Sequence, residues 1–428
     1  MQVIEYPNRE EWSPLIQRPA LEQLSLEKKV RKLLGKVKKG GDKAVKKFTK
    51  EFDGIKIKNL LVSEKEILQA TAEISEELKK AIITAKKNIT AFHSLQLQQE
   101  QVIETMPGVK CWRKSVAIEK VGLYIPGGSA PLFSTVLMLG IPAKLAGCKE
   151  IILCTPPQKD GTINPVILFT AQLAGITKIF KAGGAQAIAA MAYGTESIHR
   201  VYKIFGPGNQ YVTCAKQLIQ ADNVAIDMPA GPSEVCVLAD DSADPSFVAA
   251  DLLSQAEHGA DSQVLLVTTS KTLADKVKVE IDKQVDRLPR KKIALQALEN
   301  SKIIIVETTD DAIELVNEYA AEHLIISCAD NEAIAERIIN AGSVFLGNYS
   351  PESVGDYASG TNHTLPTNGF ARSYSGVSVD SFVKKITYQK LSEDGLRNIG
   401  RTVELMAGAE GLDAHANAVT IRLKTIGD

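Results

Sequence analysis

The hydrophobic pattern between residues 121 and 347 alternates short apolar runs with longer helical stretches. The first series of runs is VGLYI at 121–125, EIILC at 150–154, TKIF at 177–180 and VYKIF at 201–205, with helices expected near 131–147, 163–174, 185–193 and 209–220. A second series is VCVLA at 235–239, QVLLVTT at 263–269, KIIIV at 302–306, HLIIS at 323–327 and SVFLG at 343–347. Short β-branched runs between helices are typical of parallel strands with crossover helices. The pattern therefore predicts an α/β protein with two parallel-rich units.

The two ends of the chain have a different pattern. Residues 1 to about 105 are expected to be mostly helical, and they end in a long amphipathic segment that begins at Ser63. Ser63 and Glu66 have the spacing of a capping box, and apolar residues then follow at helical spacing to about residue 92. The tail from residue 377 to the end is also expected to be helical. Both ends therefore predict helical extensions around the α/β units.

The composition is that of a folded, soluble protein. Of the 428 residues, 44% are hydrophobic and 24% charged, and the formal net charge is −1. No overall positive field exists that would attract nucleic acid or an anionic membrane. The start of the chain lacks the features of a signal peptide, and no apolar run is long enough to span a bilayer. The six cysteines include no Cys-x-x-Cys pair, so we expect reduced thiols in a cytoplasmic protein.

Three glycine-rich turns follow predicted strands of the first series. They are Gly122–Gly128, Gly183–Gln186 and Gly206–Asn209. At the carboxyl ends of parallel strands, glycines let the backbone approach a phosphate, and helix N-termini favour negative charge. None of the turns has the G-x-G-x-x-G spacing of a dinucleotide-binding turn. From spacing alone, nucleotide binding and ordinary turns between strand and helix both remain open.

Candidate metal ligands lie in three separate segments. Gln255 and His258 are three residues apart near a predicted helix end, where residues at this spacing share one face. Asp356 lies within residues 347–376, a stretch rich in Gly, Ser, Pro, Asn and Thr, and a loop of this length usually has a binding role. His415 lies in the helical tail. Together these side chains predict a divalent metal site with nitrogen and oxygen ligands.

Glu322 and His323 are candidates for acid and base chemistry. They lie where a predicted helix meets a predicted strand. An imidazole can accept a proton from an alcohol near neutral pH, and a carboxylate can activate a water. Because neighbouring side chains diverge in regular structure, we expect the two groups to serve different roles. The alternative is a solvated carboxylate beside a half-buried histidine.

An ordered set of motifs resembles the histidinol dehydrogenase family over roughly residues 105–420. The motifs are VGLYIPGGSAPLFSTVLMLGIPAK, AGGAQAIAAMAYGT, FGPGNQYV, DMPAGPSEVCVLAD, DLLSQAEHG, EYAAEHLII, VGDYASGTNHTLPT and EGLDAHANAV. The resemblance implies a zinc enzyme that oxidises L-histidinol through the aldehyde to L-histidine, the last step of histidine biosynthesis, and reduces two NAD in succession. Zinc would have no redox role there.

The resemblance also implies roles for individual residues. One zinc per chain would be bound by Gln255, His258, Asp356 and His415. His323 would act as the base, and Glu322 would activate the water of the second oxidation. NAD would contact Tyr124, Gln186 and Asn209. The substrate would be surrounded by Ser233, Gln255, His258, Glu322, His323, Asp356, His363, Glu410 and His415.

For the architecture, the resemblance implies two incomplete Rossmann-like domains with helical N-terminal and C-terminal extensions. Residues 1–20 would form the N-terminal extension, and one α/β domain would comprise residues 21–121 and 235–376. The other, which contacts NAD, would comprise residues 122–234. Residues 377–428 would form a helical tail that contributes Glu410 and His415 to the active site of the partner in a homodimer.

Two other function classes remain as alternatives at this point. A zinc-dependent hydrolase of the amidohydrolase type would use metal-bound water and a proton shuttle at Glu322, and it needs no nucleotide. A non-catalytic two-domain module would use the same cleft only to capture a ligand. The glycine-rich turns count against the hydrolase, and the cluster of acid, base and metal ligands counts against the binding module.

Overall fold

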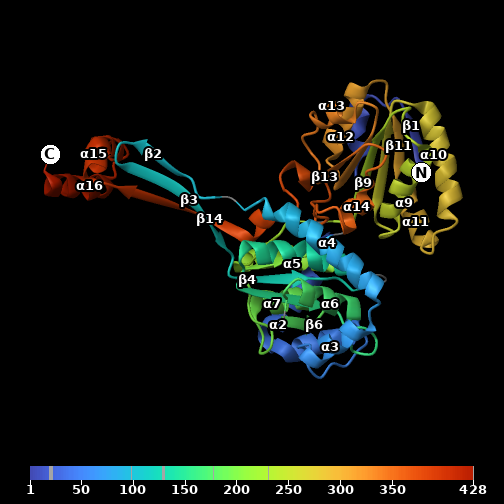
Figure 1. The fold of residues 1–428 in the computed structure, drawn as a ribbon, viewed down its shortest axis with the longest axis horizontal. Coiled ribbons are helices and arrows are strands. Elements are labelled where there is room, and N and C mark those ends of the chain that lie inside the picture. The colour runs from blue at the N-terminus through green and yellow to red at the C-terminus, as the bar shows by residue number, and fades with distance from the viewer. Residues whose placement is uncertain (19–22, 98, 128–130, 177, 230, 428) are drawn as a thin grey trace.

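The computed structural model of the protein has a body of two parts and a thin arm that projects from it (Figure 1). It describes residues 1–18, 23–97, 99–127, 131–176, 178–229 and 231–427. Two parallel sheets form the two parts of the body. The predicted α/β class with two Rossmann-like units is confirmed, although Gly128 of the first turn and Thr177 of the TKIF strand lie outside the described residues.

The larger sheet has the strand order β1, β11, β10, β9, β12, β13, and all its neighbouring pairs are parallel. Its strands are β1 (Gln2–Glu5), β9 (Glu234–Ala239), β10 (Gln263–Thr268), β11 (Lys302–Ile305), β12 (His323–Ser327) and β13 (Ser343–Leu346). Side chains alternate along a strand, so Val235 and Val237 of β9 lie in one core while Cys236 and Leu238 lie in the other. The helices that complete these two cores are α9 (Pro245–Ala256), α10 (Lys271–Val285), α11 (Lys291–Glu299), α1 (Arg9–Leu15), α12 (Thr309–Tyr319) and α13 (Asn331–Ala335).

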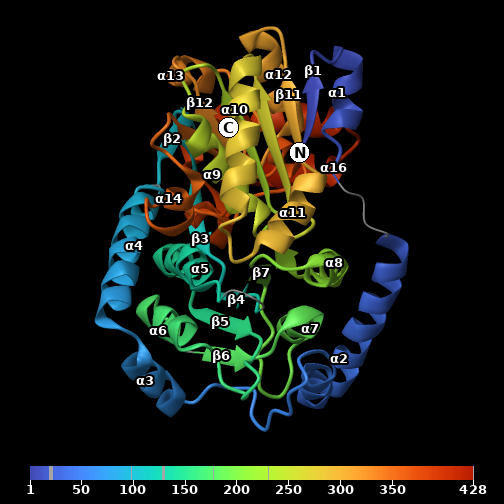
Figure 2. The ribbon, with the colours of Figure 1, turned by 90° about the vertical axis from the view of Figure 1, so that its right-hand side faces the viewer.

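The smaller sheet has the order β6, β5, β4, β7, β8 and is also parallel. Its strands are β4 (Lys120–Tyr124), β5 (Glu150–Thr155), β6 (Lys178–Lys181), β7 (Lys203–Phe205) and β8 (Ala225–Ile226). Figure 2 shows this sheet between two groups of helices. One group is α2 (Gln23–Phe52), α7 (Gly184–Tyr193) and α8 (Gln210–Ile219). The other is α3 (Glu64–Glu73), α4 (Glu76–Ser94), α5 (Phe133–Ala146) and α6 (Pro165–Leu173).

The domain grouping expected from the family needs correction in two places. Residues 21–121 were expected to belong with 235–376, but α2 and α3 share buried cores with the strands of the smaller sheet, and α4 packs on α5 in the same part of the body. Residues 1–20 were expected to be an extension, but β1 is an integral strand of the larger sheet and pairs with β11 in the register Gln2 to Lys302. An amphipathic pattern predicts that a helix has an apolar face, but not which sheet that face will cover.

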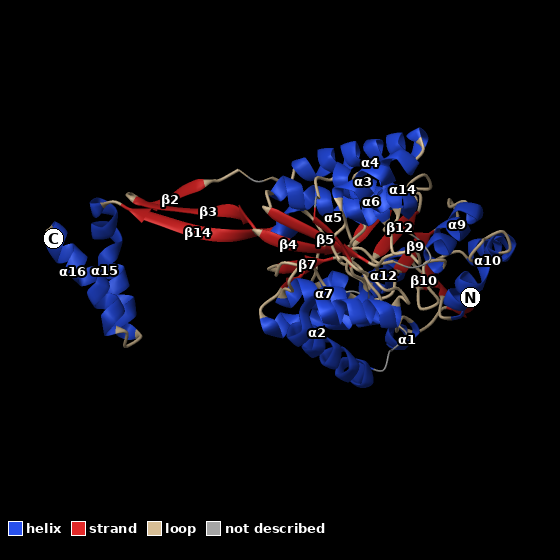
Figure 3. Cartoon of the chain, turned by 90° about the horizontal axis from the view of Figure 1, so that it is seen from below, coloured by secondary structure: helices blue, strands red, loops and turns tan. Residues whose placement is uncertain are grey.

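The arm is a three-stranded antiparallel sheet that ends in two helices (Figures 1 and 3). It consists of β2 (Val102–Met106), β3 (Val109–Ala117), β14 (Val383–Leu391), α15 (Glu393–Ala409) and α16 (Asp413–Ile426). The expectation of an all-helical tail was therefore wrong for β14. These strands were not predicted because they bury little apolar surface in this chain: all residues of β2 are exposed.

Other local predictions are confirmed or corrected in detail. The capping box at Ser63 is present, with the Ser63 N–H donating to Glu66 Oε2 at 2.9 Å. The long helix expected from Ser63 is interrupted at Ile74, whose backbone is extended, and Ser75 caps a second helix. The expected loop at 347–376 contains the short helix α14 (Glu352–Tyr357). Among the described helices, we find none with the length and apolar character that a membrane crossing requires.

Candidate active site

Glu322 and His323 lie at the start of β12, in the interior of the larger part of the body. The backbone of Ala320 is left-handed, with φ of 53°, and this ends α12 and directs the chain into the strand. Glu322 is 7% exposed and His323 is 3% exposed. The expected divergence of the two side chains is not observed, because Glu322 Oε2 lies 3.7 Å from His323 Nδ1. The solvated alternative for this pair is therefore excluded.

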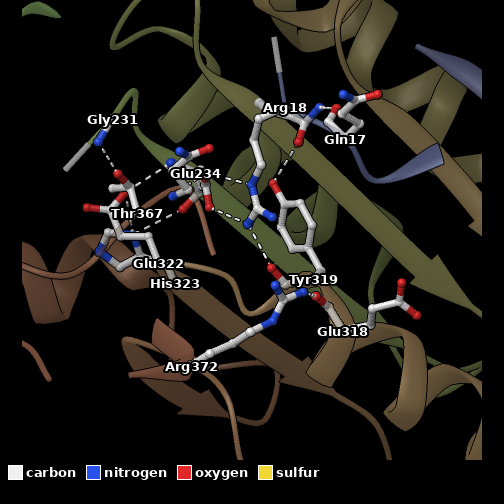
Figure 4. A network of polar contacts seen from close by, with 12 residues as sticks. Gln17, Arg18, Gly231, Glu234, Glu318, Tyr319, Glu322, His323, Thr367 and Arg372 are labelled. Carbon is white, nitrogen blue, oxygen red and sulfur yellow. Dashed lines mark hydrogen bonds and ion pairs between the residues drawn. The ribbon is translucent and has the colours of Figure 1, made fainter. Parts of the chain in front are cut away.

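The surroundings of this pair are polar and closely connected (Figure 4). Glu322 Oε2 accepts a hydrogen bond from the N–H of Glu234 at 2.9 Å. His323 Nδ1 lies 3.0 Å from Gln255 Nε2, and His323 Nε2 lies 3.2 Å from Asp356 Oδ1. Burial raises the pKa of Glu322. Burial alone would lower the pKa of His323, but the carboxylates of Glu322, Asp356 and Glu352 outweigh it and raise that pKa.

The carboxylate of Asp356, on α14, interacts with His323 and with the two predicted site histidines His258 and His363. Burial opposes ionisation of Asp356, but the hydrogen bond to His323 and the nearby imidazoles of His363 and His258 hold its pKa below the usual value. His363 Nδ1 lies 2.8 Å from the carbonyl oxygen of Asp356, and its Nε2 lies 2.9 Å from Thr135 Oγ1 on α5. The site therefore spans both parts of the body.

Three residues on the body fit as ligands of a metal ion. The coordination shell of that ion would be completed by a ligand from outside the body. Gln255 is 1% exposed, and its Oε1 has no hydrogen-bond partner in the described part of the chain. This buried oxygen, the His258 imidazole and the Asp356 carboxylate form a donor set that suits zinc with an open coordination position. Within the described ranges, no group of three or more His, Cys, Asp and Glu side chains is arranged for a metal.

Two predicted site residues are not brought to this cluster by the chain itself. Glu410 follows α15 and His415 lies on α16, and both are exposed. Figure 1 places α16 at the far end of the arm, away from α14. Ser233, in contrast, directly precedes β9 and is half-buried.

The predicted NAD contacts line one large cavity in the smaller part of the body. Tyr124, Gln186 and Asn209 all contribute to this cavity of about 1060 Å³, which we call the dinucleotide cavity. The Tyr124 hydroxyl accepts a hydrogen bond from the Gly184 N–H at 2.9 Å, at the first turn of α7. Asn209 caps α8 by accepting from two backbone N–H groups. The cavity also reaches Pro131, just before the helix that carries Thr135 and its contact with His363.

The walls of the dinucleotide cavity fit a phosphorylated, hydroxyl-rich ligand. Three lining oxygens are buried without a hydrogen-bond partner among the described residues: Asp53 Oδ2, Thr155 Oγ1 and Gln186 Oε1. A Cβ atom at Gly127 would lie 2.1 Å from Pro156, so a side chain there would fill the close approach that glycine permits. The helix α2 adds positive charge with Lys29, Lys32 and Lys36. Such a wall suits a dinucleotide pyrophosphate.

Several residues that line the cavity or support the cluster were missed by the sequence analysis. Lys29, Lys32 and Lys36 lie in a lysine-rich stretch that is typical of a solvated helical face, and Asp53 matches no known motif. Glu352 is buried beside the cluster, where its Oε1 accepts from the Ser254 hydroxyl at 2.6 Å. The unusual length of the 347–376 segment is a signal for Glu352 alone.

Comparisons with known proteins identify the family of this chain. Residues 16–423 match the family model described as histidinol dehydrogenase. A protein of that name from Bacteroides thetaiotaomicron is 62% identical over 426 residues, which is 100% of both chains, and one from Mannheimia succiniciproducens is 55% identical over 388 residues, which is 90% of both. The crystal structure of histidinol dehydrogenase from Elizabethkingia anophelis has a TM-score of 0.98 and 56% identity, with 100% of this chain and 99% of that chain covered. The chain therefore belongs to the histidinol dehydrogenase family.

Proposed function

We propose that this protein is a zinc-dependent, NAD-linked enzyme that oxidises L-histidinol through L-histidinal to L-histidine, the last step of histidine biosynthesis. The observation that carries the proposal is the buried pair Glu322 and His323, which contacts Gln255 and Asp356 in a chain 62% identical to a named histidinol dehydrogenase. Family membership makes the chain an oxidoreductase. It disfavours the zinc hydrolase and the non-catalytic binding module.

Zinc would be held by Gln255, His258 and Asp356, with His415 supplied by a second chain. When bound, it would supply a fixed positive charge that orients the amino and imidazole nitrogens of the substrate, with no change of its own oxidation state. The donor set supports this role, because it contains no thiolate and leaves room for substrate atoms. The remaining substrate contacts would come from residues around the cluster, which are Ser233, His363 and Glu410.

Proton transfer is the part of the reaction that this chain's own side chains would perform. The imidazole of His323 would accept the hydroxyl proton of histidinol as the alcohol is oxidised. The carboxylate of Glu322 would accept a proton from the water that adds to the aldehyde. Because burial raises the pKa of Glu322, its ionised form is a stronger base than an exposed carboxylate.

NAD would bind in the dinucleotide cavity and accept a hydride in each oxidation. Each step removes two electrons from the substrate, so two NAD are required for one histidinol. Tyr124, Gln186 and Asn209 would contact the nucleotide. Supporting observations are the buried oxygens without partners, the lysines of α2 and the glycine at 127.

The proposal is tested by mixing the purified protein with NAD and L-histidinol and following the absorbance of reduced nicotinamide. We expect two reduced NAD for each histidinol consumed, loss of turnover with a chelator, and recovery on addition of zinc. Hydrolysis of amides without NAD would favour the zinc hydrolase instead. Saturable binding of histidinol without any reduction of NAD would favour the binding module.

The two half-reactions should respond differently to changes in the catalytic pair. We expect Glu322→Gln to slow oxidation of the aldehyde by about 10²- to 10⁴-fold, the usual loss when a general base is removed, and to affect oxidation of the alcohol much less. His323→Ala should slow the alcohol step strongly. Steady-state rates measured separately with histidinol and histidinal check this. Equal damage to both steps in Glu322→Gln would contradict the assigned division of roles.

Asp53 should contribute to nucleotide binding, because it lines the dinucleotide cavity and its buried Oδ2 has no hydrogen-bond partner among the described residues. We expect Asp53→Asn to weaken NAD binding by about 10- to 100-fold, since a hydrogen bond to a charged group contributes about 1.5–3 kcal/mol. Calorimetric titration with NAD measures the change. Asp160→Asn is the matched control, because that carboxylate accepts from the Thr162 N–H and lies outside the cavity wall. Equal affinity in Asp53→Asn and the unaltered protein would contradict this role.

We further propose that the enzyme is a cytoplasmic homodimer in which the arm reaches the partner. The helix α16 buries none of its side chains in this chain, and the arm exposes large apolar residues such as Ile103, Met406 and Ile421. Exposed apolar surface of this kind marks an interface. All six cysteines are free, which supports a reducing compartment.

A further inference from the structure

A buried ion pair lies directly behind the catalytic residues and is formed by the first segment of the chain (Figure 4). Arg18, shortly after α1, donates from Nε and Nη2 to Glu234 Oε1 and Oε2 at 3.0 and 2.9 Å. The side chains are 14% and 2% exposed. The guanidinium also lies 4.0 Å from the centre of the Tyr319 ring and donates to the Tyr319 carbonyl at 2.7 Å. Arg18 is thus fixed at the end of α12, close to Glu322.

Glu234 connects this ion pair to the active site through its own peptide groups. Its N–H donates to Glu322 Oε2 at 2.9 Å, and its carbonyl oxygen lies 3.3 Å from both Gln255 Nε2 and His323 Nδ1. One carboxylate oxygen of Glu234 also accepts from the Asn368 N–H at 2.7 Å. A shift of Glu234 would therefore displace the hydrogen-bonding partners of Glu322, Gln255 and His323 at the same time.

The ion pair of Arg18 and Glu234 is better suited to fixing the positions of its neighbours than to stabilising the fold. A buried ion pair contributes little net stability compared with apolar side chains of the same size, because both charges lose their hydration. The two parallel hydrogen bonds of an arginine with a carboxylate do, however, fix direction as well as distance. A fully bonded buried network of this kind keeps its members in one arrangement.

We propose that Arg18 and Glu234 are positioning residues of the active site. They hold the start of β9 so that its peptide groups keep Glu322 and His323 aimed at the substrate. The inference rests on the proposed function, because it assigns the two residues to the proton transfers of that reaction. Neither residue would touch the reacting atoms.

The test uses a paired substitution, because removing one charge alone would leave the other buried and uncompensated. Arg18→Met with Glu234→Gln removes both charges, and the glutamine amide oxygen can still accept from Asn368. We expect the pair to fold with an unchanged zinc content and an unchanged KM for NAD, but with kcat for histidinal lowered by about 10²-fold, the loss expected from a small misplacement of catalytic groups. Arg18→Lys keeps the positive charge but cannot form the two parallel hydrogen bonds, and its kcat should fall less.

Two further measurements separate positioning from simple structural support. In a Glu322→Gln background, the paired substitution should slow the aldehyde step by no more than about threefold, since its main target is already disabled. Arg9→Met is the matched control: Arg9 binds Asp311 and Glu314 at 2.9 and 2.6 Å and so ties the same segment to α12, but without touching Glu234. That variant should keep full kcat.

The outcomes are distinguishable. A folded paired variant with normal zinc and kcat within about twofold of the unaltered enzyme would overturn the positioning role. A 10²-fold loss that persists unchanged in the Glu322→Gln background would overturn it as well. Absence of histidinol turnover in the unaltered protein would instead defeat the proposed function itself.

Discussion

His258→Ala is expected to lose bound zinc and turnover together while the protein stays folded. His258 is an exposed residue in the turn that follows α9, so its removal costs little packing. It would, however, remove one of the three metal ligands that we propose on the body, beside Gln255 and Asp356. Because a metal ion supplies several kcal/mol of charge stabilisation, we expect turnover to fall by at least about 10³-fold.

Elemental analysis for zinc, thermal unfolding and steady-state kinetics with histidinol measure these three consequences separately. His199→Ala is the matched control, since His199 is also an exposed imidazole but bonds to Glu150 on the smaller sheet at 2.7 Å. It should keep both zinc and turnover. One zinc per chain in His258→Ala, combined with near-normal turnover, would show that the metal site is assigned to the wrong residues.

The two parallel sheets could be predicted because their strands are buried on both faces. In β9, β10 and β12 every residue is buried, so each strand reads as a continuous apolar run. The arm lacks this property. Its strand β14 contains no buried residue and pairs with β3, which lies far away in the sequence. Strands that are distant in the sequence and share no apolar core give only a weak pattern of apolar residues in each segment.

The sequence predicts candidate site residues one by one, but it does not predict how they are arranged. Motifs identified Gln255, Glu322, His323 and Asp356, and the fold does bring these side chains together. The contact of Arg18 with Glu234 joins residues 216 positions apart, and no local pattern contains it. Such long-range partners become visible only when the packing of the first segment against the larger sheet is known.

Glu410 and His415 lie on the arm of the chain, so they do not join the other predicted site residues on the body of the same chain. The arm, which ends in α15 and α16, extends away from α14, and it carries large apolar side chains that are exposed in the described part of the chain. An arm of this kind can complete a site by crossing to a second copy, and a closed two-fold dimer would then contain two equivalent shared sites. In that arrangement, each site combines His323 of one chain with His415 of the other.

Mixing two inactive variants is expected to restore activity if the arms cross. His415→Ala chains and His323→Ala chains should each be nearly inactive alone, because the first would lack a proposed metal ligand at both sites and the second would lack the proposed base at both sites. In a mixed dimer, one site combines the intact His323 of the first chain with the intact His415 of the second, while the other site carries both changes. Random exchange of equal amounts places about half of the chains in mixed dimers, each with one intact site of two.

We therefore expect about a quarter of the activity of the unaltered enzyme after exchange, measured as NAD reduction with histidinol. Two different affinity tags allow the mixed dimers to be purified, and these should have about half of the full activity per dimer. A variant changed at both His323 and His415, mixed with unaltered chains, is the control, because its mixed dimers contain no intact site. If tagging proves that exchange took place and the two single variants regain no activity, His415 acts within its own chain, and the arm must fold back instead of crossing.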